Sequence, residues 1–436
     1  MMSINWTKGA LLTATVLFGM QAPAFAESNG TVEYRIQRGD TLVELARDYF
    51  VNARAIKTVM TLNNIRNPRR LQIGKSLTVP RDVLRYKSEP LRVQAFSGPV
   101  TISRQGQAAQ PEIGDIVAQG AVISTGRKGF ISLVGTGNSR ISIPSNSSVR
   151  LSGAKRYLIN DAIDFDVRVL RGRSEVKAPT LKGEERYRVG TPRAVTAVRG
   201  TEFRVAFDEG LERSLTEVTE GEVLVASGTR EVATPAGLGV ATSANGLGTP
   251  ETLLNAPELV DPTSIRTDAI VQFQAKPLEA AKAYRTQIAR DAGFLEIIAE
   301  DVSEDGDITF DDLDDGRLFV RSRGIAESGL EGFSNSYNFR RKRLGVTGGV
   351  EPSPFADAFK FVWLPEGEGN SFGAFQLWDT KAPDVLLVDE VGLETNGFYV
   401  SNLEPGSYKW RVATFQIDEG ETIKVWAPAQ EFTVSD

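Results

Sequence analysis

The stretch from about Pro90 to Thr242 constrains the fold most, because short apolar alternations recur in it between glycines. Examples are "LRVQAFSGPVTIS", "GAVISTGRKGFISLV" and "SRISIPSNSSVRLSG". Apolar residues that alternate with polar ones over roughly four to eight positions predict strands with one buried face. Glycine-rich intervals predict the turns between such strands. The sequence therefore predicts an all-β unit in this stretch.

A different pattern precedes it, in "YRIQRGDTLVELARDYF" from Tyr34 to Phe50. A polar–apolar alternation leads into a turn, and the apolar residues from Leu42 to Tyr49 then follow the spacing of an amphipathic helix. A second helical pattern, "ARAIKTVMTLNNI", and a strand pattern, "LQIGKSLTVP", follow. The order strand, helix, helix, strand is therefore predicted within 32–82, with Asp40 or Thr41 capping the first helix.

Composition excludes several classes of function. The 436 residues include no cysteine and no histidine, which excludes disulfides, thiol nucleophiles, Ser-His-Asp triads and most zinc sites. Lysine and arginine number 50 against 56 acidic residues, so the net charge of −6 argues against a nucleic-acid partner. We therefore expect no cofactor and no metal site.

Residues 1–26 have the organisation of a secretory signal peptide. Lys8 supplies the positive charge, an apolar stretch follows, and Ala24 and Ala26 have the spacing that a signal peptidase recognises, so Glu27 would be the first mature residue. The apolar stretch is shorter than the roughly 20 residues of a transmembrane helix, and an uncleaved anchor is the alternative. We expect an exported, soluble protein without stable membrane insertion.

Three motifs follow one another within residues 32–82. They are "YRIQRGDTLVELA" at the front, Asn63 and Asn64 at the end of the second helix, and "NPRRLQIGKSLTVP" at the back. In this order they resemble a LysM domain. LysM domains bind the N-acetylglucosamine units of peptidoglycan or chitin, so the resemblance implies a shallow glycan groove between two loops. One position departs from the family, because many LysM domains carry an aromatic residue where this chain has Val43.

The resemblance implies glycan-binding residues in both loops. They are Gly39, Asp40, Thr41 and Leu42 on one side, and Asn67, Pro68, Arg69 and Leu71 on the other. An N-acetyl sugar needs hydrogen bonds from groups at tight turns and apolar contact for its methyl group and ring face. The structural alternative is that the first loop only caps a helix and that Leu71 only packs in the core. The two interpretations are compatible.

The predicted all-β unit, residues 90–233, contains a second set of motifs. The clearest is "VGTPRAVTAVRGTEFRV", supported by "SGPVTI", "GDIVAQGAVISTGRKGFISLV" and "TEVTEGEVLV". These motifs resemble the FecR domain, which lies outside the cytoplasmic membrane in its family. Well-known members relay signals from an outer-membrane receptor to a sigma factor, but that role needs a cytoplasmic segment and a membrane helix, which we do not expect here. The resemblance therefore implies a periplasmic β scaffold for protein contact. The segments "RGRSEVKAP" and "TPRAVTAVRGTEF" could be basic functional clusters, but we favour a structural role for them, with a tight turn at Arg199 to Thr201.

A linker is predicted at 234–264, where small and turn-forming residues dominate, and a divergent internal repeat follows it. The alignment pairs Leu313 with Leu403, Gly316 with Gly406, Val320 with Trp410, Arg321 with Arg411, and Phe273 with Trp363. Each copy resembles a fibronectin type III or other immunoglobulin-like sandwich. We expect one such domain at 265–343 and a second at 350–436.

The acidic segment "DVSEDGDITFDD", from Asp301 to Asp312, approximates an EF-hand calcium loop. An EF-hand needs helices on both sides, whereas the sequence after this segment has a turn and then a strand pattern. Asp312 is also shorter than the bidentate glutamate usual at the last position. We therefore predict a solvated acidic loop, with calcium binding as the alternative.

The sequence does not show the catalytic residues of the enzymes that often accompany LysM domains. Peptidoglycan amidases and the common cell-wall peptidases need histidine or cysteine, while glycosidases need a pair of carboxylates that does not stand out in this β-rich sequence. We predict a mainly β multidomain protein that is not an enzyme, with a small βααβ LysM domain, an all-β FecR-like domain and two immunoglobulin- or fibronectin-like β-sandwiches.

Two functions are compatible with this architecture. In the first, the LysM domain binds peptidoglycan glycan strands in the periplasm, and the β domains contact an envelope protein or act as a scaffold. In the alternative, the chain is a periplasmic regulatory or sensory protein of the FecR type, and its LysM domain only localises it to the cell wall.

Overall fold

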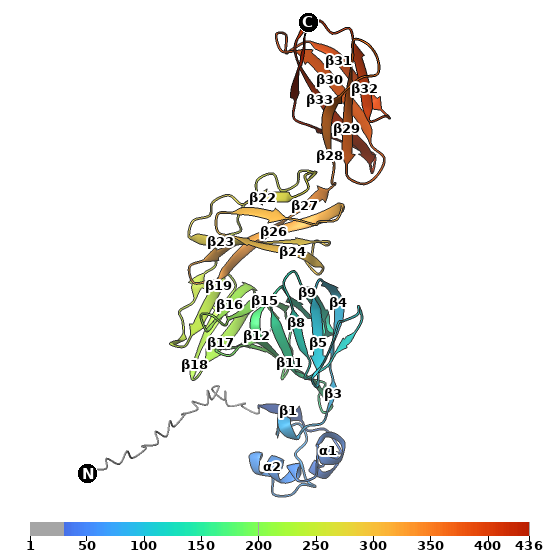
Figure 1. Ribbon diagram of the computed structural model, residues 1–436. Helices are drawn as coiled ribbons and strands as arrows, with labels where there is room; N and C mark the ends of the chain where they lie inside the picture. Colours follow the sequence, from blue (N-terminus) through green and yellow to red (C-terminus); the bar gives the residue numbers. More distant parts are fainter. Residues whose placement is uncertain (1–29, 199, 436) are drawn as a thin grey trace, which may run out of the picture. The chain divides into compact units, whose positions relative to one another are not determined.

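The computed structural model describes residues 30–198 and 200–435 (Figure 1). The predicted signal peptide, residues 1–26, and one residue of the predicted tight turn, Arg199, lie outside the described residues. The chain divides into two compact units, of which unit 1 ends at Arg85 and unit 2 begins at Tyr86. Two short α-helices occur in the described part of unit 1 and strands dominate elsewhere, which confirms the predicted mainly β fold class.

Unit 1 has the predicted order strand, helix, helix, strand. Its elements are β1 (Thr31–Arg35), α1 (Leu42–Tyr49), α2 (Ala55–Leu62), β2 (Ser76–Pro80) and a 3-10 helix (Arg81–Val83). β1 and β2 pair antiparallel. Val32, Leu42, Val59 and Val79, one from each of the four main elements, are completely buried. The helices and strands of this small unit therefore share one core.

The first part of unit 2 is the central β domain, which forms two sheets that share strand β12 and close into one structure. Its strands are β3 (Tyr86–Ser88), β4 (Leu91–Ser97), β5 (Val100–Arg104), β6 (Gln107–Ala109), β7 (Ile116–Val117), β8 (Val122–Thr125), β9 (Phe130–Val134), β10 (Arg140–Ile143), β11 (Ser148–Tyr157), β12 (Ile163–Lys177), β13 (Arg186–Gly190), β14 (Val195–Val198), β15 (Glu202–Asp208), β16 (Arg213–Glu220), β17 (Glu222–Ser227), β18 (Arg230–Pro235), β19 (Leu238–Ser243), β20 (Gly246–Leu247) and β21 (Glu251–Thr252). A short 3-10 helix (Thr136–Asn138) precedes β10.

The long strand β12 changes sheets at Gly172. Residues before Gly172 pair with β11 and β13, and residues from Gly172 onward pair with β10 and β15. Gly172 has a φ of +73°, and a Cβ at this position would lie 2.4 Å from the hydroxyl oxygen of Ser147. The bend that joins the two sheets therefore depends on glycine.

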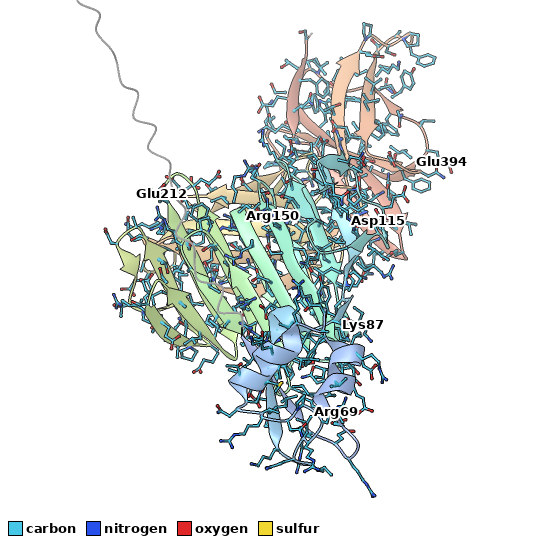
Figure 2. All side chains as sticks on the ribbon, turned by 90° about the horizontal axis from the view of Figure 1, so that it is seen from below. Arg69, Lys87, Asp115, Arg150, Glu212 and Glu394 are labelled. Atoms are coloured by element: carbon cyan, nitrogen blue, oxygen red, sulfur yellow. The ribbon has the colours of Figure 1, made fainter. Side chains whose placement is uncertain are left out.

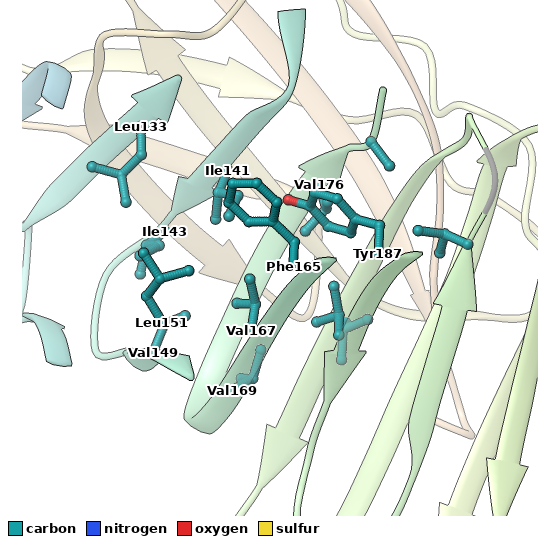
Figure 3. Packing of buried hydrophobic residues seen from close by; sticks show 14 of the residues in the cluster. Leu133, Ile141, Ile143, Val149, Leu151, Phe165, Val167, Val169, Val176 and Tyr187 are labelled. Atoms are coloured by element: carbon teal, nitrogen blue, oxygen red, sulfur yellow. The ribbon is translucent and has the colours of Figure 1, made fainter. Parts of the chain in front are cut away.

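The core of the central β domain lies between its sheets (Figure 3). Phe165 on β12 and Tyr187 on β13 stack with their ring centroids 5.5 Å apart. Tyr187 is 1% exposed, and its hydroxyl has no hydrogen-bond partner among the described residues. Burial raises the pKa of this hydroxyl above its usual range. Tyr187 therefore stabilises the core through its ring, and its unpaired hydroxyl opposes folding.

The linker prediction was wrong in its first half. β19 pairs with β16, and β21 pairs with β19, so the central β domain extends to Thr252 instead of ending at residue 233. Val240 of β19 is completely buried. Gly237 and Gly246, which suggested a connector, have φ values of +85° and +102° at the turns between these short strands. Strands this short and this rich in small residues have too little periodicity to be distinguished from a linker.

The first sandwich has a four-stranded sheet in the order β24-β23-β26-β27 and a separate pair, β22 and β25. The strands are β22 (Val271–Gln274), β23 (Ala281–Ala289), β24 (Ile297–Ser303), β25 (Asp307–Phe310), β26 (Gly316–Ala326) and β27 (Glu331–Arg341). Phe273, Ile288 and Val320 belong to the hydrophobic cluster between these layers.

The second sandwich has one sheet in the order β28-β29-β32 and a larger one in the order β31-β30-β33-β34, in which β35 also pairs with β33. The strands are β28 (Gly345–Glu351), β29 (Ala358–Glu366), β30 (Phe372–Asp379), β31 (Leu386–Leu393), β32 (Gly397–Ser401), β33 (Gly406–Asp418), β34 (Glu421–Trp426) and β35 (Gln430–Val434). Phe361, Phe375 and Trp410 pack together between the sheets.

The aligned residues of the internal repeat occupy matching places in the two sandwiches. Gly316 begins β26 and Gly406 begins β33, and both strands are interior strands of the larger sheet. Val320 and Trp410 point from these strands into the two cores, where they are 0% and 1% exposed. The repeat is therefore structural as well as sequential.

Candidate functional site

The first candidate loop ends where Thr41 caps helix α1. The Thr41 hydroxyl accepts a hydrogen bond from the backbone N–H of Glu44 at 3.2 Å and donates one to the Glu44 carboxylate at 2.9 Å. The cap fixes the start of α1, as the spacing of these two residues predicted. Of the two capping residues considered, the structure selects Thr41.

Asp40 closes the turn before the helix. Its Oδ2 atom accepts hydrogen bonds from the Tyr34 hydroxyl at 3.0 Å and from the backbone N–H of Gln37 at 2.7 Å. Burial and the hydrogen bond to Asp40 raise the pKa of Tyr34 to about 12. Gly39 has a φ of +98°, so the turn needs its conformational freedom, whereas a Cβ there would meet no atom within 4 Å.

The two candidate loops lie side by side. The backbone N–H of Leu42 donates a hydrogen bond of 2.8 Å to the carbonyl oxygen of Pro68. The second loop is also closed on itself, because the Asn67 side chain accepts from the backbone N–H of Arg69 at 3.0 Å and its carbonyl accepts from that of Arg70 at 3.1 Å. The structure thus brings together the two segments that the sequence placed on opposite sides of a groove.

The candidate side chains differ in what they can offer a ligand. Leu42 is completely buried and its N–H is already bonded to Pro68, so it stabilises the loop and offers no group to a ligand. The carboxylate of Asp40 is held within its own turn. The remaining candidates reach the surface, with Gly39, Asn67 and Arg69 exposed and Thr41, Pro68 and Leu71 half-buried (Arg69 is labelled in Figure 2).

A hollow of about 410 Å³ opens beside the second loop. Asn67 and Leu71 line it together with residues that were not among the candidates, which include Ile65, Arg66, Arg70 and Gln72. None of the candidates from the first loop lines it. The run "NNIRNPRR" was the available signal, because it surrounds Asn67 and Pro68 with two kinds of group, an apolar side chain and guanidinium donors.

Asn63, which belongs to the sequence motif, has a structural role. Its Nδ2 atom donates to the carbonyl oxygens of Val59 at 2.8 Å and Thr78 at 2.7 Å, and its Oδ1 atom accepts from the backbone N–H of Thr78 at 2.8 Å. These bonds tie the end of α2 to β2. The hollow beside the second loop therefore has one wall that is fixed to the core.

The acidic segment contains the turn between β24, which ends at Ser303 in the four-stranded sheet, and β25, which begins at Asp307 and pairs with β22. Asp305 accepts hydrogen bonds from the Ser303 hydroxyl at 2.5 Å and the Asp307 N–H at 3.1 Å, and these two bonds lower its pKa. The helices of an EF-hand are absent from this described segment, and no three acidic side chains converge as a metal site anywhere in residues 30–198 and 200–435. The carboxylates here close a turn.

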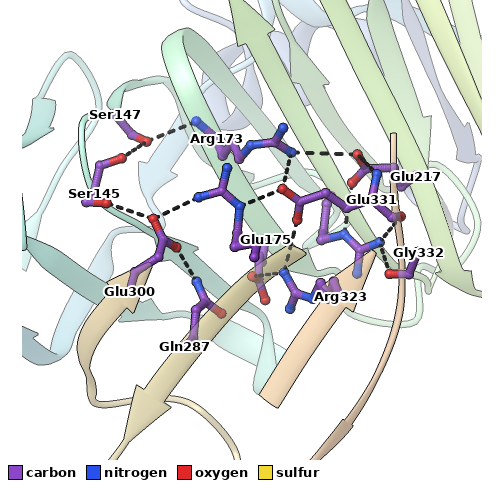
Figure 4. A network of polar contacts seen from close by, with 12 residues as sticks. Ser145, Ser147, Arg173, Glu175, Glu217, Gln287, Glu300, Arg323, Glu331 and Gly332 are labelled. Carbon is purple, nitrogen blue, oxygen red and sulfur yellow. Dashed lines mark hydrogen bonds and ion pairs between the residues drawn. The ribbon is translucent and has the colours of Figure 1, made fainter. Parts of the chain in front are cut away.

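Buried arginines and glutamates join the central β domain to the first sandwich (Figure 4). Glu175 of β12 accepts hydrogen bonds from Arg321 at 3.0 Å and Arg323 at 2.7 Å, both on β26. Burial opposes ionisation of Glu175, but the charges of these two arginines outweigh it and hold its pKa well below the usual value. Burial and the neighbouring Arg323 lower the pKa of Arg321 to about 9, which leaves it protonated at neutral pH.

Glu331 is a second centre of this network. It is 1% exposed, lies 2.6 Å from Arg285 and 3.0 Å from Arg173, and its backbone N–H donates to Glu217 at 3.0 Å. Arg204 of the central β domain donates to Glu217 at 2.9 Å and to the carbonyl oxygen of Glu331 at 2.6 Å. Burial opposes ionisation of Glu331, but the surrounding arginines outweigh it and hold its pKa far below the usual value. Arg173 has a structural role here through its ion pairs with Glu217 and Glu331.

Two family models match the chain, the LysM domain at residues 34–80 and FecR protein at residues 121–224. No curated protein matches it. The LysM match indicates glycan binding, and both families bind or regulate rather than catalyse. Among the described residues, no helix has the length and apolar character needed to span a membrane.

Solved structures show only low similarity. A candidate anti-sigma factor from Parabacteroides distasonis is 16% identical, with 30% of this chain and 59% of that chain covered and a TM-score of 0.26. The FN1-FN3 domains of chicken CNTN1 are 13% identical, with coverage of 56% and 95% and a TM-score of 0.21. The chain thus spans 59% of the length of the first relative. The family matches and the strand order give the architecture, a LysM domain at 34–80 and a FecR domain at 121–224, followed by two fibronectin- or immunoglobulin-like β-sandwiches.

Proposed function

We propose that unit 1 binds the N-acetylglucosamine-containing glycan strands of peptidoglycan in the periplasm, and that unit 2 presents β surfaces to an envelope protein. The observation that supports glycan binding best is the contact between the candidate loops. The Leu42–Pro68 hydrogen bond joins them inside the segment that the LysM model matches. We propose the domain limits expected from the sequence, except that the central β domain extends to Thr252.

The second loop supplies the chemistry that an N-acetyl sugar requires. Asn67 and Arg70 offer hydrogen-bonding groups at the hollow, while Ile65 and Leu71 offer apolar surface for the methyl group and the ring face. Thr41 reaches the surface on the neighbouring loop, and the helix cap fixes its position. A groove bounded by both loops would contact a sugar from two sides.

A peptidoglycan sedimentation assay tests the proposal with the mature chain, residues 27–436, and a chain that lacks residues 27–82. The shortened chain keeps all of unit 2, which is compact by itself. We expect the mature chain to sediment with purified sacculi and the shortened chain to stay in solution. Equal sedimentation of the two chains would exclude unit 1 as the glycan-binding part.

Point substitutions in the mature chain locate the groove. Thr41→Arg places a long side chain between the loops, and we expect the affinity for N-acetylglucosamine oligomers to fall about tenfold or more, a loss of ~1.4 kcal/mol. Thr58→Arg is the matched control, because Thr58 is exposed on α2 and belongs to neither candidate loop. Thermal unfolding separates obstruction from loss of the cap. Unchanged affinity of folded Thr41→Arg would place the groove elsewhere.

A regulatory function is the second candidate, supported by the FecR match at 121–224. In that case unit 1 would localise the protein, and unit 2 would receive or transmit a signal through a protein contact. A cell that lacks the native protein and exports the chain without residues 27–82 distinguishes the two. Full restoration of the native phenotype would favour regulation, whereas loss of restoration would favour a glycan-bound scaffold.

A further inference from the structure

The larger sheet of the second sandwich carries an aromatic and cationic outer face. The residues of this face, which we call the Arg411 face, are Phe372, Trp378, Arg411, Phe415, Lys424 and Trp426. The register places them on one side of the sheet. Phe372 and Lys424 both lie opposite Phe415, and Trp426 lies opposite Ala413. Arg411 is two positions from Ala413 on β33, and Trp378 lies opposite Lys409, two positions from Arg411. All six side chains reach the surface.

Cations and rings alternate across this face. The guanidinium of Arg411 lies 4.4 Å from the ring centroid of Trp426 and 5.8 Å from that of Trp378. The ammonium of Lys424 lies 4.4 Å from the Trp426 ring. Around these groups the sheet adds exposed aliphatic residues, of which Val391 is 60% and Ile417 66% exposed. Tryptophan and arginine surrounded by apolar side chains are the composition of protein-interface hot spots.

The internal repeat provides a comparison for this face. Arg321 is the aligned residue of the first sandwich, and each arginine faces a glutamine in register on the neighbouring strand. Arg321 Nε donates to Gln287 at 2.9 Å, and Arg411 Nε donates to Gln376 at 2.8 Å. An aromatic ring lies against each guanidinium, at 4.2 Å for Arg321 and 4.4 Å for Arg411. The arginine–glutamine pairs therefore correspond, although the ring comes from the loop before β24 in the first sandwich and from β34 in the second.

In the first sandwich this arrangement is a docking face. A terminal nitrogen of Arg321 donates to both carboxylate oxygens of Glu175 on the central β domain, at 3.0 Å each. Phe294, the ring against Arg321, packs in a buried cluster with Phe130 of the central β domain. The outer face of β26 around Arg321, which we call the Arg321 face, thus binds a carboxylate that is bordered by apolar side chains.

The Arg411 face has no such counterpart within the described part of the chain. Its arginine contacts Gln376 and two rings, and neither Arg411 nor Lys424 forms an ion pair with a described carboxylate. We propose that the Arg411 face docks onto another protein at a β surface where an Asp or Glu carboxylate, bordered by apolar residues, takes the place that Glu175 takes at Arg321. This inference rests on the protein-contact part of the proposed function and is independent of glycan binding.

Photocrosslinking in cells tests the inference with the full chain. A photoreactive phenylalanine analogue replaces Phe415 on the Arg411 face or, as the control, Tyr399, which is exposed on β32 of the opposite sheet. We expect a protein adduct from position 415 alone, with the crosslinked segment of the partner containing Asp or Glu. Arg411→Glu and Lys424→Glu should each lower its yield about tenfold, whereas Lys381→Glu, in an exposed turn, should leave it unchanged.

The other outcomes overturn the proposal. They are no adduct, an adduct with glycan, an adduct of two copies of this chain, or a yield that neither charge reversal lowers. Lys424→Glu guards against misfolding of Arg411→Glu, because Lys424 is exposed whereas Arg411 is half-buried. Sedimentation with sacculi, measured on the same variants, separates the two proposals. Lost crosslinking with retained sedimentation concerns only the Arg411 face, whereas removal of residues 27–82 should abolish sedimentation and leave the adduct.

Discussion

The two sandwiches use the outer faces of their larger sheets in opposite ways. In the first, the Arg321 side chain is 11% exposed and Glu175 of the central β domain binds its guanidinium. In the second, Arg411 also bonds to a glutamine, Gln376, and lies against a ring, but it has no carboxylate partner within the described residues. The same strand pattern therefore gives an internal contact in one repeat and an available surface in the other. Whether a neighbouring domain covers the face decides between them.

The strongest way to break this comparison is the same substitution at both positions. Arg321→Gln removes one of the two arginines that donate to Glu175, whose side chain is 20% exposed and keeps Arg323. A hydrogen bond to a charged group is typically worth about 1.5–3 kcal/mol, so we expect a loss of that size. Arg411→Gln removes a half-buried cation without an ion-pair partner in the described chain, so we expect a loss of about 0.5 kcal/mol or less. Urea unfolding of residues 83–436 measures both. Equal losses would mean that the Arg321 face is not held by its ion network.

Acid should weaken the docked face selectively. Glu175 and Glu331 have depressed pKa values in the folded protein, where the unfolded chain has a value near 4.5. Such carboxylates contribute stability above the unfolded pKa and lose it as the pH falls toward the folded pKa. We therefore expect the free energy of unfolding to decrease below about pH 4.5, by up to ~1.4 kcal/mol per pH unit for each group.

Glu331→Gln is the variant that checks this origin. Since glutamine cannot ionise, the unfolding free energy of this variant should change less steeply between pH 4.5 and pH 3.5 than that of the native chain. Glu421→Gln, at an exposed position of β34, should retain the native slope. Identical slopes for the native chain and Glu331→Gln would assign the acid sensitivity to other carboxylates.

The sequence predicted local structure better than it predicted contacts between domains. The helical spacing from Leu42 to Tyr49 and the alternations of the central β domain identified their elements, because each pattern reports one element and its own buried face. The same rule places Arg321 and Arg323 on the outer face of a strand, and nothing in the local pattern shows that this face is covered. Glu175, which covers it, lies 146 residues away from Arg321 in the sequence.

The candidate glycan site shows the same limit. The motif identified both loops, and the spacing that predicted helix α1 also places Leu42 in the core, where the structure has it. Its assignment as a groove residue came from position in a motif and not from its periodicity. The hollow beside Asn67 adds Ile65 and Arg70, whose role depends on how the second loop folds back on itself. That fold depends on backbone hydrogen bonds, which side-chain patterns do not report.

Tyr187 extends the comparison to a buried polar group that has no partner among the described residues. Its buried hydroxyl is unpaired among the described residues, whereas the buried charges at Glu175 are paired. Tyr187→Phe keeps the ring that stacks on Phe165 and removes the hydroxyl, so we expect the free energy of unfolding to rise by about 1 kcal/mol. Thermal and urea unfolding measure the change. A loss of stability would indicate that the hydroxyl has a partner after all, such as a buried water molecule.

The smallest effect is expected where a polar pair lies near the surface, at Tyr34 and Asp40. Burial and the hydrogen bond to Asp40 raise the pKa of Tyr34 to about 12. A raised pKa in the folded state contributes stability that is complete below about pH 10 and is lost as the pH rises through 12. In the native chain, ultraviolet absorbance should therefore show one tyrosine that ionises near pH 12 in unit 1. Asp40→Asn removes the carboxylate charge but leaves the burial, which is the larger cause, so the midpoint should move only part of the way toward 10. A full return to 10 would show that the carboxylate of Asp40, and not burial, sets the pKa of Tyr34. The Tyr34–Asp40 pair would then depend mainly on charge, as the contact between Arg321 and Glu175 does.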